Sequence, residues 1–178
     1  GFISDINDKQ NDIISKKFNF YYKELKNRGP DYSEIKKIKF KSKIIHLGFV
    51  RLSIQDTRQN SNKIFHDENN IILFNGEIYN FKELKKKYLS NTKFETNTDT
   101  EVLFRLYQLK GKNILTELRG IFSFVFIDLK NENIQLVRDF TGTKPLYYLN
   151  KKQNIFFSSE AWFLYSVSEK KIDENCLD

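Results

Sequence analysis

Cysteine is almost absent from this 178-residue sequence, which contains one, Cys176. A single thiol cannot close a disulfide within one chain, so the sequence excludes a disulfide-stapled fold and is consistent with a reducing compartment. The sequence also has no apolar run near the roughly 20 residues that a membrane-spanning helix needs. Its first ten residues, GFISDINDKQ, lack the basic start and apolar stretch of a signal peptide. We therefore expect a soluble, cytoplasmic protein that does not bind membranes.

Negative charge is in deficit, because 30 Lys and Arg residues face 23 Asp and Glu residues and leave a formal charge of +7. The excess is mostly Lys, scattered through the whole chain, and its densest tract is KKIKFKSK at 36–43. There Lys alternates with Ile or Phe, as in an amphipathic strand with one solvated face. We expect no nucleic-acid partner, although a phosphate-binding tract or a basic nucleic-acid-binding domain stays a testable alternative.

Apolar residues make up 39% of the sequence and aromatic residues 15%, which excludes a disordered chain and fits one strand-rich domain. Apolar spacing and turn residues predict helices over 9–27, 80–90, 98–111 and 160–167. They predict strands over 44–50, 71–74, 121–127, 134–137, 146–149 and 155–157. We expect Asn80 with Glu83, and Thr98 with Glu101, to cap two of the helices. The run 121–127 is nearly all apolar, which is typical of a strand covered on both faces. The pattern therefore predicts a layered α+β domain.

Five short motifs occur in order along the chain. They are Arg28-Gly29-Pro30-Asp31, Arg51-Leu52-Ser53-Ile54-Gln55-Asp56, Asn75-Gly76-Glu77-Ile78-Tyr79-Asn80, Thr98-Asp99-Thr100-Glu101, and Arg138-Asp139 followed by Gly142 and Lys144-Pro145-Leu146-Tyr147-Tyr148. Together they resemble the glutaminase domain of asparagine synthetases, over Gly1 to about Ser166. The resemblance implies an N-terminal-nucleophile hydrolase fold, with four αββα layers in which two antiparallel sheets lie between helices. It divides the chain into a glutaminase domain, 1–166, and a linker, 167–178, toward a synthetase domain that this sequence does not contain.

The resemblance also implies the chemistry. A cysteine thiol at the mature amino terminus attacks the side-chain amide of glutamine, with its own α-amine as the base, and water then clears the glutamyl thioester. The family begins Met-Cys-Gly, whereas this chain begins Gly1-Phe2-Ile3 and matches from the residue after the nucleophile. Cys176 cannot replace it, because a thiol in the tail has no adjacent free α-amine. Either the first residues are missing from the sequence, which we favour, or the protein is an inactive variant that keeps the pocket.

Three residues of the second motif are implied by the resemblance to bind glutamine. The planar guanidinium of Arg51 suits bidentate capture of the α-carboxylate, and backbone groups of Ser53 and Ile54 would line the same pocket. Outside this motif, an Arg at the end of a strand would more simply form a structural ion pair.

The resemblance assigns the oxyanion hole to Asn75 and Gly76, through the Asn side-chain amide and the Gly backbone N–H. Taken alone, Asn-Gly is also a common hairpin turn. Glu77 and Asp99 would bind the α-ammonium of glutamine, a cation that needs carboxylate partners once it leaves water. An acid at position 99 could instead serve only the dipole of the helix that begins there.

The remaining motifs are expected to be structural. Segment 28–31 could be only a helix stop and turn, and the resemblance places it near the nucleophile as support. Segment 138–148 would shape the pocket wall without taking part in the chemistry.

We expect no cofactor or metal for this domain, and ATP and magnesium are implied only for the missing synthetase domain. Its predicted partners are glutamine and that synthetase domain, in a parent that could be a homodimer. A non-catalytic glutamine-binding module is one alternative. The glutaminase domain of another amidotransferase is a second, but those making glucosamine phosphate or phosphoribosylamine have Arg-Trp-Ala-Thr or Arg-Tyr-Ser-Thr where this chain has Arg-Leu-Ser-Ile.

Overall fold

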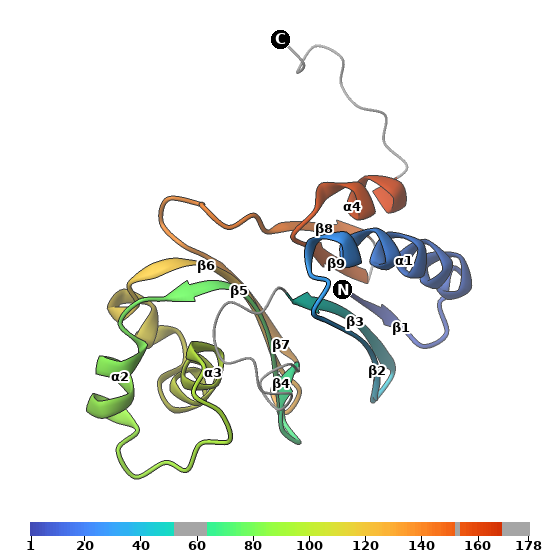
Figure 1. Ribbon diagram of the computed structural model, residues 1–178. Coiled ribbons are helices and arrows are strands. Elements are labelled where there is room, and N and C mark those ends of the chain that lie inside the picture. The colour runs from blue at the N-terminus through green and yellow to red at the C-terminus, as the bar shows by residue number, and fades with distance from the viewer. Residues whose placement is uncertain (52–63, 152–153, 169–178) are drawn as a thin grey trace. The chain divides into compact units, whose positions relative to one another are not determined.

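The computed structural model describes residues 1–51, 64–151 and 154–168, which form two compact units. The first unit takes its described residues from 1–27, 35–48 and 147–168, and the second from 28–34, 49–51 and 64–146. Each unit contains one sheet and two α-helices, as Figure 1 shows. The prediction of an α+β fold with two antiparallel sheets is confirmed.

The first unit is built on a five-stranded sheet with the order β2-β3-β1-β9-β8. Its strands are β1 (Phe2–Asp5), β2 (Tyr32–Phe40), β3 (Lys43–Arg51), β8 (Tyr147–Lys151) and β9 (Asn154–Ser158). The first residues of β2, 32–34, and the last of β3, 49–51, are counted with the second unit. Helices α1 (Asn11–Leu25) and α4 (Ala161–Ser168) cover one face, where Phe18 and Phe163 pack on Phe2 and Phe156. The alternating exposure along β2 confirms an amphipathic strand in the Lys-rich tract.

The second unit is built on a four-stranded sheet with the order β4-β5-β6-β7. Its strands are β4 (Phe65–His66), β5 (Asn70–Ile78), β6 (Gly120–Asp128) and β7 (Asn133–Arg138), and its helices are α2 (Phe81–Tyr88) and α3 (Asp99–Lys110). Short 3-10 helices occupy Lys26–Arg28 and Gly111–Glu117. The core of this unit lies where α3 packs on β5 and β6, with Leu103 and Tyr107 against Ile72 and Phe124.

Two predictions about helix α3 have different outcomes. Thr98 caps the helix as expected, because its hydroxyl oxygen accepts a hydrogen bond from the backbone N–H of Glu101. Gly111 ends it with a φ of +56°, which glycine adopts without steric cost. Helical spacing also predicts that Leu109 faces the core with Val102, Leu103, Leu106 and Tyr107, and for Leu109 this prediction is wrong, since 61% of its surface is exposed.

Strand β6 bears out the prediction of a doubly covered strand, because all of residues 122–127 are buried. Two strands, β1 and β4, were not predicted, and β2 begins before the predicted tract. The final helix extends to Ser168, two residues past the predicted domain boundary at 166, and its Val167 is buried. None of the described helices is long and apolar enough to cross a membrane.

Candidate functional site

The predicted oxyanion residues lie within strand β5 and not in a turn. Asn75 pairs with Ser123 of β6, and Gly76 pairs with Phe122, in an antiparallel register that runs unbroken from Asn70 to Ile78. The hairpin alternative for Asn75-Gly76 is therefore wrong. Because side chains alternate along a strand, Asn75 and Glu77 share one face of β5, and Ile78 lies on the face that packs against α3.

Glycine is required at position 76 for two reasons. Its φ is +142°, in the region that side chains other than glycine rarely adopt, and a Cβ there would lie 2.1 Å from the carbonyl oxygen of Ile121. Gly120 has the same requirement on the opposite strand, where a Cβ would lie 2.0 Å from the carbonyl oxygen of Glu77. The backbones of β5 and β6 thus approach each other closely beside Asn75 and Glu77. Only glycine fits at position 76 because of this close approach.

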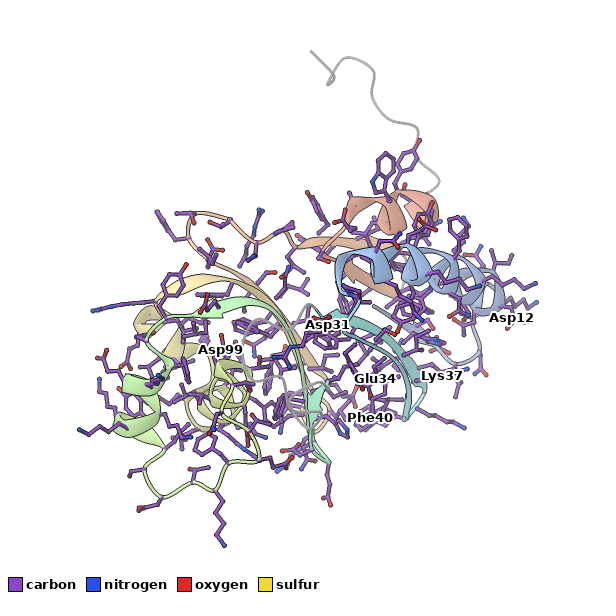
Figure 2. All side chains as sticks on the ribbon, in the orientation of Figure 1. Asp12, Asp31, Glu34, Lys37, Phe40 and Asp99 are labelled. Carbon is purple, nitrogen blue, oxygen red and sulfur yellow. The ribbon has the colours of Figure 1, made fainter. Side chains whose placement is uncertain are left out.

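Asp99 meets the end of strand β5. It is the first residue of α3 (Figure 2), and its Oδ2 accepts a 2.9 Å hydrogen bond from the backbone N–H of Ile78. Burial raises the pKa of Asp99 above its usual value, and the like charge of Glu77 raises it further, against hydrogen bonds from Ile78 and Thr100 that lower it. The negative charge of Glu77, the residue before Ile78, therefore acts on the Asp99 carboxylate, which is 6% exposed. A bound cation would stabilise both carboxylates.

Asn80, the last residue of the motif at 75–80, explains how this end of β5 is held. Asn80 does not cap α2 through its side chain, so that prediction is wrong. Its amide instead donates to the carbonyl of Glu117 at 2.9 Å and accepts from the N–H of Arg119 at 3.0 Å. The N–H of Tyr79 also donates to the carbonyl of Arg119 at 2.7 Å. These bonds fix the segment that leads into Gly120 against the end of β5.

The motif at 28–31 supports the strand end that carries Arg51. Pro30 forms a parallel bridge with Arg51, and the N–H of Asp31 donates to the carbonyl of Arg51 at 3.2 Å. A Cβ at Gly29 would lie 2.5 Å from the backbone nitrogen of Arg51, so only glycine fits there. The structural role predicted for this segment follows from these contacts. Arg51 belongs to the same unit as Glu77 and Asp99.

Asp139 anchors the fifth motif to strand β6. Its carboxylate accepts hydrogen bonds from the N–H groups of Phe122, Thr143 and Lys144 and from the hydroxyl of Thr141, at 2.7–3.3 Å. Burial raises the pKa of Asp139, but the four hydrogen bonds outweigh burial and hold it below its usual range.

Three further hydrogen bonds complete this anchor. The guanidinium of Arg138 donates to the carbonyls of Gly142 and Lys144, and Ser123 Oγ donates to the carbonyl of Pro145 at 3.2 Å. Ser123 and Phe122 are the β6 partners of Asn75 and Gly76, so the loop after β7 is fastened directly across from them. The anchoring role of Asp139 was not predicted from the sequence, although an Asp followed by Thr at 141 and 143 is a typical local hydrogen-bonding pattern.

Gly1 lies immediately before strand β1 in the first unit. Its nitrogen donates to the carbonyl of Phe157 at 2.7 Å, and the N–H of Phe157 donates back to its carbonyl at 2.9 Å. A Cβ on Gly1 would lie 2.6 Å from the Phe157 ring and 2.9 Å from the carbonyl oxygen of His46. Burial lowers the pKa of its amine to about 4, so the position suits an uncharged N–H such as that of a peptide bond.

Some predicted residues lie outside the part of the chain that the structure describes. These are Ser53, Ile54 and Cys176, together with 169–178 of the predicted linker. Within the described ranges, no three His, Cys, Asp or Glu side chains gather as a metal site requires. The expectation of no metal in this domain stays a prediction.

Solved structures with a similar backbone define the class of fold. Glutamine phosphoribosylpyrophosphate amidotransferase from Bacillus subtilis, solved with ADP and GMP, aligns with a TM-score of 0.55 and 24% identity over 72% of this chain and 30% of its own. A second structure, an allosteric regulatory enzyme of purine biosynthesis, aligns with a TM-score of 0.53 and 23% identity. The fold is that of the N-terminal-nucleophile amidotransferases.

Sequence comparison identifies the family. The model of the glutamine amidotransferase domain matches residues 1–178, and this chain belongs to that family. A putative glutamine-hydrolysing asparagine synthetase of Methanocaldococcus jannaschii is 36% identical over 92% of this chain, and a probable one of Acanthamoeba polyphaga mimivirus is 39% identical over 82%. This chain spans 35% and 27% of those two relatives, so it corresponds to about a third of their length or less.

Proposed function

We propose that this domain binds glutamine and hydrolyses its side-chain amide, and that the ammonia passes to an ATP-dependent synthetase domain that makes asparagine or a related amide. Both would belong to one cytoplasmic parent protein. The observation that carries the proposal is the hydrogen bond from Ile78 that holds the buried Asp99 carboxylate at the end of β5, the strand that also carries Asn75, Gly76 and Glu77. An α-ammonium there would offset the cost of burying the Asp99 charge, and the oxyanion donors would lie on the same strand.

The pocket residues would divide the ligand between them. Glu77 and Asp99 would hold the α-ammonium, and Arg51, with backbone groups of Ser53 and Ile54, would hold the α-carboxylate. The Asn75 amide and the Gly76 N–H would then donate to the side-chain carbonyl oxygen as it becomes negative. One such donor lowers a barrier by roughly 2.7–4 kcal/mol in other enzymes.

Hydrolysis needs a thiol, and we propose that a cysteine joined directly to Gly1 supplies it. Its sulfur would attack the amide carbon, and its own α-amine would carry the thiol proton to the departing ammonia. Water would then cleave the thioester to glutamate and restore the thiol. Two observations support this position: the Gly1 nitrogen forms the bond of a strand N–H with Phe157, and no side chain fits at Gly1.

Glutamine binding tests the pocket without any thiol. In a calorimetric titration we expect the chain as given to bind L-glutamine, and Arg51→Lys to weaken binding roughly tenfold by losing the bidentate contact. Arg119→Lys is the matched control, since it makes the same exchange of guanidinium for ammonium at an exposed position of the same unit. Binding of L-glutamine that neither substitution changes would contradict the proposed carboxylate contact.

The alternative is a glutamine-binding module without catalysis, which would keep the same pocket residues. Titration alone does not separate the two, because both bind. Hydrolysis by a chain with a cysteine before Gly1 does separate them.

A further inference from the structure

Glu101 is a buried carboxylate in the first turn of α3, with 0% of its surface exposed. Its Oε1 accepts a 2.9 Å hydrogen bond from the N–H of Glu95. Its Oε2 accepts two more from Thr96, at 2.6 Å from the N–H and 2.8 Å from the hydroxyl. Arg105, one turn along the helix, lies 3.9 Å from Oε1. The Glu101 carboxylate therefore binds residues 95 and 96, which precede the helix. In an ordinary capping box it would instead bind the backbone N–H of the cap residue, Thr98.

A second set of bonds closes a ring around the start of the helix. The hydroxyls of Thr96 and Thr98 lie 2.9 Å apart, and the N–H of Thr98 donates to the Thr96 hydroxyl at 3.3 Å. The Thr98 hydroxyl accepts from the N–H of Glu101, also at 3.3 Å. Thr96, Thr98 and Glu101 thus hold one another, and all three are buried.

Asp99 lies inside this ring in the sequence, between Thr98 and Glu101, but its carboxylate reaches outward to the N–H of Ile78. The backbone of Asp99 is therefore held on its amino-terminal side by Thr96 and Thr98, and on its carboxyl-terminal side by Glu101, which is bonded to both. A shift of residues 95–98 would move the Asp99 carboxylate along the end of β5, away from its place beside Glu77.

We propose that Glu101 is a positioning residue for glutamine, which holds the Asp99 carboxylate where the α-ammonium binds. The inference rests on the proposed function. A role in stability alone would predict a different result, because a loosened helix would weaken every ligand of the pocket equally. Positioning of Asp99 would affect only ligands that carry the α-ammonium.

The test compares two ligands by calorimetric titration of the chain as given. L-glutamine carries the α-ammonium, and glutaramate has the same carboxylate and amide but no α-amino group. Glu101→Gln places an NH₂ group against N–H donors, so residues 95–98 must shift. We expect the Kd of glutamine to rise roughly three- to tenfold, with the Kd of glutaramate unchanged. Asp99→Asn should show the same selectivity with a larger rise.

Two further variants keep the test decisive. Thr96→Val is nearly isosteric and removes the hydroxyl bond to Glu101 while the charge of Glu101 remains. We expect this variant also to raise the Kd of glutamine, so it serves as the test if Glu101→Gln does not fold. Glu83→Gln, in the first turn of α2, is the matched control and should change neither ligand.

The inference is overturned if Glu101→Gln and Thr96→Val leave glutamine binding unchanged, or weaken both ligands equally, while Asp99→Asn remains selective. If the unsubstituted chain does not bind glutamine at all, the proposed function itself fails. The two failures are therefore distinguishable.

Discussion

The backbone N–H of Ile78 donates a 2.9 Å hydrogen bond to Oδ2 of Asp99, and this bond joins the first turn of α3 to the end of strand β5. It brings the Asp99 carboxylate into electrostatic contact with Glu77, one residue before Ile78. A helix-dipole role for Asp99 would need neither the bond to Ile78 nor a neighbouring acid. This relationship favours the ligand-binding interpretation of Asp99.

Asp99→Asn should separate stability from binding. Asn can still accept from Ile78, and it removes an ionised group whose pKa is raised in the folded state, first by burial and then by Glu77. A raised pKa means that ionisation opposes folding above the unfolded value of 3.8. We therefore expect the empty variant to resist urea at least as well at pH 7, while glutamine binding falls roughly tenfold or more. An empty variant that unfolds more easily would contradict this account.

Gly76→Ala should destabilise the second unit strongly. The added Cβ would lie 2.1 Å from the Ile121 carbonyl oxygen, in addition to the backbone strain of a φ of +142°. The matched control is Gly111→Ala, which carries a φ of +56° but has no atom within 4 Å of the new Cβ. We expect a loss of about 1 kcal/mol for the control, from backbone strain alone, and a clearly larger loss at position 76, measured by urea denaturation. Equal losses would show that the close approach of β5 and β6 is not rigid.

Asp139→Asn should loosen the loop after β7. Asn offers one carbonyl oxygen where the carboxylate offers two, so some of the four donors from Phe122, Thr141, Thr143 and Lys144 lose their partner. We expect a loss of about 1.5–3 kcal/mol in the free energy of unfolding. Asp128→Asn is the control, because the carboxylate of Asp128, at the end of β6, accepts its hydrogen bonds from the near neighbour Asn131. A control loss as large as that of Asp139→Asn would contradict the anchoring role.

Stability should rise with pH between about 4 and 8. Burial lowers the pKa of the Gly1 amine from 8.0 to about 4. Burial, followed by the charges of Lys37 and the Gly1 amine, lowers the pKa of His46 from 6.5 to about 4. In this range the unfolded chain binds more protons than the folded chain, so the free energy of unfolding increases with pH, by at most about 1.4 kcal/mol per pH unit for each group.

An alanine placed before Gly1 isolates the contribution of the amine. Above about pH 7.5, one unit beyond the ordinary pKa of His46, the contribution of that residue is nearly complete, so the amine supplies most of the slope up to about pH 8.5. The extended chain, in which the Gly1 nitrogen is an amide, should lose that slope in urea titrations. The same slope in both chains would show that the Gly1 nitrogen is not buried as an amine.

The local sequence predicts elements whose stabilising contacts are local. Thr98 and Gly111 bound helix α3 as expected, because a cap bonds within its own turn and a glycine sets its own φ. Strand β6 could be predicted because its uninterrupted apolar run needs cover on both faces. Leu109 was misplaced because it lies at the edge of the helical stripe, where spacing alone does not decide burial.

Contacts between distant residues explain what could not be predicted. Strand β1 is four residues long and depends on partners at His46 and Phe156. The turn preference of Asn75-Gly76 gives way to pairing with β6, some 45 residues further along the chain. Asn80 was expected to cap α2, but the backbone at Glu117 and Arg119 takes its side chain instead.

The candidate site was predicted from motifs, and the structure adds the physical reasons for some of their residues. Gly29 and Gly76 are glycines because backbone atoms occupy the space of a Cβ. The pairing of Asp99 with β5 could not be derived from spacing, since it depends on how α3 packs against the sheet.

Glutamate release from L-glutamine, by the chain with a processed cysteine directly before Gly1, tests the central claim most directly. The chain with alanine in that place is the control, because it has the same length and the same amide at Gly1. We predict hydrolysis by the cysteine form alone, reduced by Asp99→Asn mainly through a higher KM. No hydrolysis by a folded cysteine form that still binds glutamine would contradict catalysis by this domain and leave a glutamine-binding module.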